Sequence, residues 1–147
     1  MNSRTPIARR PGHVAACAAA SGLLLGLLVG QGLAQTAAPS EHKGLAVEQL
    51  GVVPAESMAA QVGLDDRILL LRRITIEPGG QIARHSHESV PGVVYMESGS
   101  WIEGRDGGET EHAAGTTFVE DKDTVHWFYN HGEEPASALV CDIKPAS

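Results

Sequence analysis

Short hydrophobic or alternating segments, separated by turns rich in Gly, Pro and Asp, run through the chain from residue 45 onward. The clearest lies at residues 67–76, which end on Arg-Ile-Thr-Ile with the period of two of a half-buried strand. Similar segments are residues 45–53, 81–87, 93–97, 101–103, 111–113, 116–120, 125–129 and 136–143. Because strand signals recur about every eight to ten residues and no long helical period interrupts them, the pattern predicts an all-β barrel or sandwich.

Two of the connections carry specific expectations. Residues 77–80, Glu-Pro-Gly-Gly, predict a tight turn between two strands, since Pro fixes φ and Gly accepts a positive φ. Residues 57–63 predict one turn of helix, with Ser57 as its N-cap and Gly63 as its stop.

The first 34 residues have the composition of an export signal. Arg4, Arg9 and Arg10 precede an almost wholly apolar run at residues 14–29, and small residues follow at 32–34. We therefore expect residues 1–34 to be a signal peptide, residues 35–44 a polar linker and residues 45–147 one β-barrel domain. The protein would then be periplasmic or secreted.

Two alternatives to a cleaved general export signal stay open. The apolar run is just short of a membrane-spanning helix, so the chain could instead remain anchored at its N-terminus. The Arg9-Arg10 pair could mark twin-arginine export, although the residues around it fit that signal poorly.

Charge and cysteine content restrict the partners of the remaining domain. Without its three N-terminal arginines the chain has 8 basic and 18 acidic residues, a net charge near −10. Such a surface argues against binding to nucleic acid or to an anionic membrane. Cys141 is the one cysteine after residue 34, so no disulfide can form within the domain.

Three histidines carry the main functional signal. His85 and His87 are separated by one residue on a predicted strand, so their side chains point to the same face while Ser86 points away. His126, about forty residues later, can join them if the intervening chain folds back and pairs in a closed sheet. The sequence therefore predicts a small barrel built around a metal ion.

These residues resemble the two motifs of the cupin superfamily. In the first motif, a Gly, five residues and His-x-His match Gly79, His85 and His87, and its closing Gly matches Gly99. In the second motif, the Gly, His and Asn positions match Gly115, His126 and Asn130. The resemblance covers residues 67–143 and implies a single double-stranded β-helix, or jelly-roll barrel.

The chain departs from both motifs. The glutamate that should follow His87 by four or five positions falls on Pro91 or Gly92, and neither side chain can bind a metal. The Pro and Gly of the second motif are replaced by Asp121 and Asp123, which changes a turn. The resemblance thus implies three ligands, His85, His87 and His126, and leaves the fourth open.

Three neutral imidazoles with open coordination positions suit Fe, Mn, Ni, Cu or Zn, and affinity alone does not choose among these divalent ions. A substitute carboxylate could be Glu88, Glu97 or Glu103, although a solvent-exposed position is the simpler expectation for each. His42, His112 and His131 lack motif spacing and are expected at the surface.

A substrate pocket is expected beside the metal. Phe128 shares the face of His126 by strand alternation, and Val94 and Met96 are further candidates for the pocket wall. Arg84 flanks the metal strand and could attract an anion at the rim, although an ordinary surface arginine is the simpler expectation.

The sequence supports two classes of function. The first is a metal-dependent enzyme of the dioxygenase, lyase or isomerase type that acts on a small organic molecule. The second is a non-catalytic module that carries a metal or a small ligand. Since cupins resemble one another in pairing their barrels, a homodimer is expected, with residues 45–53 as an arm between subunits.

Overall fold

A computed structural model describes residues 37–147, which fold almost entirely as β-structure. One helix and eight strands follow one another along the chain. They are β1 (Lys43–Val53), α1 (Ala55–Val62), β2 (Arg67–Ser86), β3 (Gly92–Ser98), β4 (Ser100–Arg105), β5 (Gly108–Ala113), β6 (Thr117–Glu120), β7 (Val125–Tyr129) and β8 (Ala136–Pro145). The prediction of an all-β domain is confirmed.

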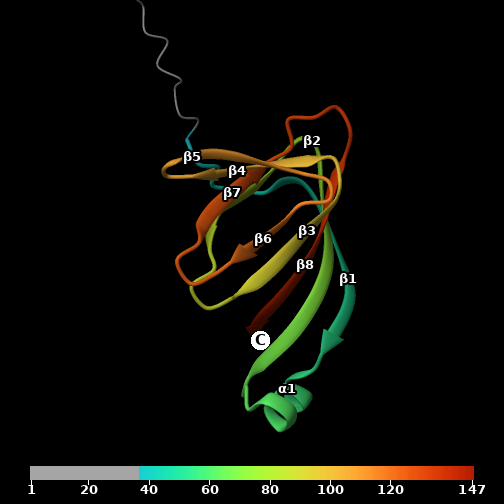
Figure 1. Ribbon diagram of the computed structural model, residues 1–147, viewed down its shortest axis with the longest axis vertical. Coiled ribbons are helices and arrows are strands. Elements are labelled where there is room, and N and C mark those ends of the chain that lie inside the picture. The colour runs from blue at the N-terminus through green and yellow to red at the C-terminus, as the bar shows by residue number, and fades with distance from the viewer. Residues whose placement is uncertain (1–36) are drawn as a thin grey trace, which may run out of the picture. The chain divides into compact units, whose positions relative to one another are not determined.

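The strands curl into a jelly-roll barrel that is nearly closed. Their hydrogen-bonded order is β5-β4-β7-β2-β8-β3-β6, and β1 pairs with β2 outside that path. All pairings between these strands are antiparallel. Figure 1 shows β5, β4 and β7 crossing one side of the barrel, while β6, β3, β8 and β1 run along the other.

The long strand β2 belongs to both sides of the barrel. Its first half pairs with β8 and β1, and its second half pairs with β7. The tight turn predicted at residues 77–80 is therefore wrong, because the chain bends there without reversing. Gly79 has φ of 68°, and a Cβ on Gly80 would come within 2.8 Å of the backbone oxygens of Glu77 and Lys43. Both glycines thus permit a sharp bend that turns β2 toward β7.

The helix α1 connects β1 to β2. Pro54, and not Ser57, occupies its N-cap position, where the fixed φ of proline suits a helix start. Gly63 ends the helix with φ of 68°, and its N–H donates to the carbonyl of Ala59, as expected for a left-handed cap.

The core is apolar and lies between the two sides of the barrel. Its buried members include Ile74, Ile76, Val94, Met96, Ala138 and Val140 from β2, β3 and β8, with Trp101 and Phe128 from β4 and β7. Packing of β-branched and aromatic side chains from both sides closes the barrel without a disulfide, and Cys141 is free.

The predicted signal peptide, residues 1–34, lies outside the described residues. The described part of the expected linker lies against the barrel before β1 begins at Lys43. The N–H of Arg84 donates to the carbonyl of Pro39, and that of Ala83 donates to Nδ1 of His42. Among residues 37–147, no helix has the length and apolar character needed to cross a membrane.

Candidate metal centre

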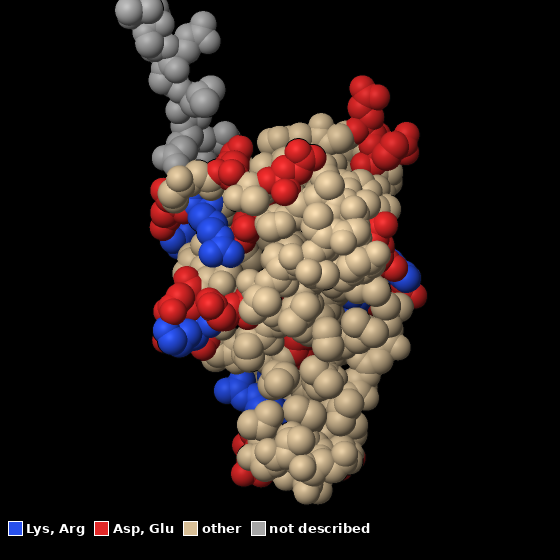
Figure 2. Space-filling model, viewed as in Figure 1, with Lys and Arg blue, Asp and Glu red and all other residues tan. Residues whose placement is uncertain are grey.

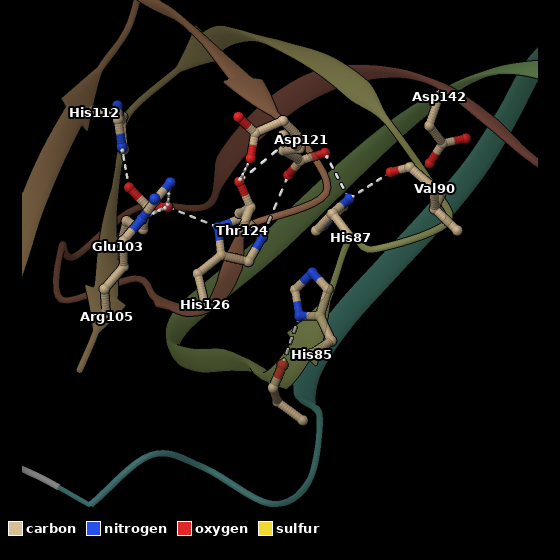
Figure 3. A network of polar contacts seen from close by, with 12 residues as sticks. His85, His87, Val90, Glu103, Arg105, His112, Asp121, Thr124, His126 and Asp142 are labelled. Carbon is tan, nitrogen blue, oxygen red and sulfur yellow. Dashed lines mark hydrogen bonds and ion pairs between the residues drawn. The ribbon is translucent and has the colours of Figure 1, made fainter.

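Strand pairing brings the three predicted histidines together. His85 in β2 and His126 in β7 are register partners, so their side chains share one face of the sheet. His87 follows β2 two residues after His85, and its N–H donates to the carbonyl of Thr124, which continues the pairing. The centroids of the three rings lie 4.7 to 4.9 Å apart. Figure 3 shows the rings around one common space.

A β-bulge in β2 makes this convergence possible. Between the pairs Ile82–Phe128 and His85–His126, β2 has one more residue than β7. Ile82 and His85, which would otherwise face opposite sides of the strand, therefore both face the interior. The bulge also presents the carbonyl of Ala83 to Nδ1 of His85, at 2.8 Å.

Each histidine is fixed in one tautomer by an acceptor on its Nδ1 atom. Nδ1 of His85 donates to the carbonyl of Ala83, and Nδ1 of His87 donates to the carbonyl of Val90, both at 2.8 Å. Nδ1 of His126 donates to Oε1 of Glu103 at 2.7 Å. Since these acceptors carry no proton, the Nε2 atoms hold the free lone pairs that a metal requires.

The free nitrogens converge. One ligand atom from each histidine lies within 4.8 Å of those of the other two. The Nε2 atoms of His87 and His126 are buried and have no hydrogen-bond partner in the described part of the chain. Each buried nitrogen without a partner destabilises the folded state by about 1–3 kcal/mol. A cation bound to both Nε2 atoms would remove that destabilisation.

Burial favours the neutral form of His85 and His87. Burial, together with the charges of the neighbouring histidines, lowers the pKa of His85 to about 4, despite the hydrogen bond that its Nδ1 donates to the carbonyl of Ala83. Burial also lowers the pKa of His87. Neutral imidazole is the form that ligates metals, so these rings are ready to bind at neutral pH.

Glu103 supports the site from behind His126, and its expected solvent-exposed position is wrong. The side chain is buried, with 4% of its surface exposed. Burial alone would raise the pKa of Glu103, but hydrogen bonds from His126, His112 and Arg105 lower it to about 2. Figure 3 shows His112 and Arg105 on the side of Glu103 away from His126. The carboxylate therefore orients His126 and does not face the space between the rings.

His112 was expected at the surface, which is also wrong. Its Nε2 atom lies 3.0 Å from Oε2 of Glu103, and its ring lies 4.0 Å from that of Phe118, centroid to centroid. His42 and His131 are exposed, as expected.

The two other carboxylates considered from the sequence lie elsewhere. Glu88 is exposed, and Glu97 is paired with Arg73 on the outside of the barrel. Arg84 is exposed and pairs with Asp106 at 3.1 Å.

Sequence reasoning missed a carboxylate that does reach the histidines. Glu120, the last residue of β6, is 4% exposed. Its Oε1 atom lies 3.5 Å from Nε2 of His126, and its Oε2 atom lies 3.5 Å from Nδ1 of His87. Burial, together with the charge of Asp142, raises the pKa of Glu120 to about 7. No local pattern in the sequence marked Glu120, because it reaches the site only through the pairing of β6 with the strand that contains Gly92.

A cavity of ≈ 530 Å³ is lined by two of the three rings, those of His85 and His87. The rest of its wall is mostly apolar, and its charged groups are Arg72, Lys144, Glu120 and Asp142. Of the three residues expected to form the pocket wall, Phe128 lines this cavity. Val94 and Met96 are fully buried in the adjoining core.

The donor set fits a divalent transition metal. Three neutral imidazoles with their Nε2 atoms directed to one space, each oriented through Nδ1, form the arrangement that Fe, Mn, Ni, Cu and Zn accept in proteins. One side of that space is open to the cavity, so a small molecule could reach an ion held there.

Comparison with known proteins agrees with this architecture. The family model described as "Cupin domain" matches residues 72–142, a range that includes all three histidines. No curated protein matches the chain.

Several solved structures share the fold at low sequence identity. The Cupin_2 domain of an XRE family transcriptional regulator from Enterobacter cloacae is 17% identical, with a TM-score of 0.53, and the match covers 70% of this chain and 99% of that one. The polyketide cyclase RemF from Streptomyces resistomycificus is 20% identical, with a TM-score of 0.54 and coverage of 74% and 70%. A predicted oxalate decarboxylase from Thermotoga maritima is 21% identical, with a TM-score of 0.52 and coverage of 73% and 93%.

These structures establish the fold, and the family match places both histidine segments inside it. Residues 72–142 of the chain therefore form a cupin domain.

Proposed function

We propose that this protein is an exported cupin that binds one divalent transition metal ion through His85, His87 and His126 and presents it to a small organic molecule. The observation that carries the proposal is the convergence of three oriented imidazoles, two of which, those of His85 and His87, line a cavity. The export assignment rests on the composition of residues 1–34.

The protein side chains would position and desolvate the reacting molecule. Ile82, Trp101 and Phe128 exclude water from the cavity beside the rings, which strengthens electrostatic interactions there. Glu103 keeps the proton of His126 on Nδ1, so that Nε2 stays available. A bound Fe, Mn, Ni, Cu or Zn ion would supply Lewis-acid or oxygen-activating chemistry, as a dioxygenase, lyase or isomerase requires.

The cavity favours a molecule with an apolar body and a small polar group. Most of its wall is apolar, and its charged groups are of both signs, Arg72 and Lys144 together with Glu120 and Asp142. Nε of Arg72 is buried and has no partner among the described residues, so it remains available to an acceptor on the ligand. Two solved structures with this fold are named as a polyketide cyclase and a predicted oxalate decarboxylase, which supports action on small molecules.

Metal content and turnover test the proposal. We expect protein purified from its native compartment to contain about one transition metal ion per chain, and His87→Ala to lose it. His131→Ala, which changes an exposed histidine outside the site, should retain the metal. An absence of transition metal in the wild type, or full retention by His87→Ala, would rule the site out.

A non-catalytic carrier gives a different result in the same preparation. With candidate small molecules added to the metal-loaded protein, an enzyme consumes them continuously, whereas a carrier binds them to saturation and releases them unchanged. Product formation above one equivalent per chain therefore separates the two classes.

A further inference from the structure

The first histidine motif lacks its carboxylate, and the structure shows what fills that space. Gly92 stands at the motif's glutamate position at the start of β3, and it is the register partner of Glu120 in β6. Register partners in an antiparallel pair project their side chains to the same face of the sheet. Glu120 therefore extends to the same face that a side chain at Gly92 would use.

The two positions compete for one volume. A Cβ on Gly92 would lie 2.9 Å from Oε2 of Glu120 and 3.2 Å from Cβ of Asp142. Carbon atoms rarely approach an oxygen this closely, so a glutamate at residue 92 and a glutamate at residue 120 could not both occupy the present positions. The absence of a side chain at Gly92 is what admits the carboxylate of Glu120.

One carboxylate oxygen lies at ligand distance from the donor nitrogen of His126, while the other lies 3.5 Å from Nδ1 of His87, the atom that donates to Val90. Two donors bound to one metal at about 2.1 Å stand about 3.0 Å apart at a right angle and about 3.4 Å apart at the tetrahedral angle. Oε1 of Glu120 lies 3.5 Å from Nε2 of His126, close to the second value. Neither that nitrogen nor Oε2 of Glu120 has a hydrogen-bond partner among the described residues.

The local charge also favours a cation. Glu120 and Asp142 are both buried, at 4% and 1% exposure, and Arg72 is the basic residue paired with Asp142. Glu103 has its own partners in Arg105, His112 and His126. When ionised, Glu120 is thus a buried anion without a paired cation in the described chain, a costly arrangement that a metal ion would compensate.

We propose that Glu120 ligates the same metal ion as His85, His87 and His126, and so supplies from β6 the carboxylate that the motif lacks at Pro91 and Gly92. This inference rests on the proposed metal site and adds a specific anionic ligand to it. The site then has three neutral donors and one anionic donor. Compared with three neutral donors alone, this set favours hard divalent ions such as Fe(II) and Mn(II).

The test is titration of the purified, metal-stripped protein with Co²⁺ and Mn²⁺, followed by calorimetry and by the visible absorption of Co²⁺. Glu120→Gln retains the shape of the side chain but removes the charge, and we expect it to weaken binding at least about tenfold and to change the Co²⁺ spectrum. Glu111→Gln, an exposed change on β5, is the matched control and should bind as the wild type does.

A transplanted carboxylate gives a second, independent variant. The double variant Gly92→Glu with Glu120→Gly returns the carboxylate to the motif position and removes the competing side chain. We expect it to bind Co²⁺ more tightly than Glu120→Gln does. Thermal unfolding in the presence of a chelator verifies that each variant is folded.

The outcomes separate this inference from the proposed function. Wild-type protein that binds neither ion would overturn both. Tight binding by the wild type with unchanged affinity and spectrum in Glu120→Gln would overturn only the role of Glu120. The role of Glu120 would also be contradicted if the double variant bound Co²⁺ no more tightly than folded Glu120→Gln does.

Discussion

Nδ1 of His126 lies 2.7 Å from Oε1 of Glu103, and the two side chains are 0% and 4% exposed. A buried carboxylate in this position fixes the ring orientation of the histidine and raises the basicity of its free nitrogen. Glu103 is therefore a positioning residue for the proposed metal ion.

Replacement of Glu103 should weaken metal binding without removing a donor from the site. Glu103→Gln retains an acceptor for His126 but loses the charge, and Glu103→Ala loses both, so we expect affinity to fall about 10-fold and up to about 100-fold respectively. Calorimetric titration with Co²⁺ measures the effect. A Glu103→Ala protein that is folded and binds as tightly as Glu111→Gln would contradict the positioning role.

Burial of Glu120 makes the stability of the metal-free protein depend on pH. The pKa of Glu120 is raised from 4.5 to about 7, so between these values the folded state retains a proton that the unfolded state has released. The contribution of Glu120 to stability is therefore present below pH 4.5 and is lost as the pH rises toward 7. The loss is of the order of 3 kcal/mol.

The comparison with Glu120→Gln isolates this contribution. His85, with its pKa lowered to about 4, acts in the opposite direction, because the unfolded histidine gains a proton as the pH falls below 6.5. This second effect is common to both proteins and cancels in their difference. Urea unfolding in a chelating buffer should show Glu120→Gln gaining about 3 kcal/mol relative to wild type between pH 4.5 and 7. A constant difference over that range would disprove the assignment.

Arg72 and Asp142 form an ion pair whose acid is buried. The side chains are 24% and 1% exposed, and Nη2 of Arg72 donates to Oδ2 of Asp142. Since Arg72→Met leaves a carboxylate buried without a partner, we expect a loss of about 3 kcal/mol in the free energy of unfolding. Arg84→Met removes the exposed pair with Asp106 and should cost less than about 1 kcal/mol.

Removal of both charges completes that experiment. In the double variant Arg72→Met with Asp142→Asn no uncompensated charge remains, so stability should recover part of the loss. Urea unfolding of the wild type, the single variants Arg72→Met and Asp142→Asn, and the double variant measures the coupling. Equal losses in Arg72→Met and Arg84→Met would show that solvent screens the Arg72 pair as well.

Local patterns were sufficient for the fold and for the histidine cluster. The period of two in residues 67–76 and the His-x-His spacing depend only on neighbouring residues, and both follow from strand geometry. The pairing of His85 with His126 needed the additional assumption of a closed sheet, which the barrel satisfies.

The rest of the site depends on tertiary pairing that no local pattern contains. The alternation of side chains along a regular strand could not show that Ile82 and His85 share a face, because an unpredicted bulge lies between them. Residue 120 is adjacent to residue 92 only through the pairing of β6 with β3, so Glu120 had no local signal. The bend at Gly79 resembled a tight turn because both use a glycine with positive φ.

The outer surface bears on the predicted homodimer. Figure 2 shows few charged side chains over the region of β3, β6 and β8. Val93, Tyr95 and Val119 are exposed there, and Val93 is the register partner of Val119. A second group of exposed apolar side chains lies on β1 and α1 and includes Val47 and Val62. β1 pairs with β2 of its own chain along one edge, and no strand of residues 37–147 pairs with its other edge.

We therefore expect two copies to associate through the outer face of β3 and β6, where burial of apolar side chains offsets repulsion between acidic subunits. Val119 on β6 is 64% exposed and is the residue to replace at this face. Val62 on α1 is 61% exposed and provides the matched control. Val119→Glu should shift the mass in solution from dimer to monomer, while Val62→Glu should not. Light scattering at physiological ionic strength measures both. The opposite pattern would place the interface at β1 and α1, and a monomeric wild type would remove the homodimer altogether.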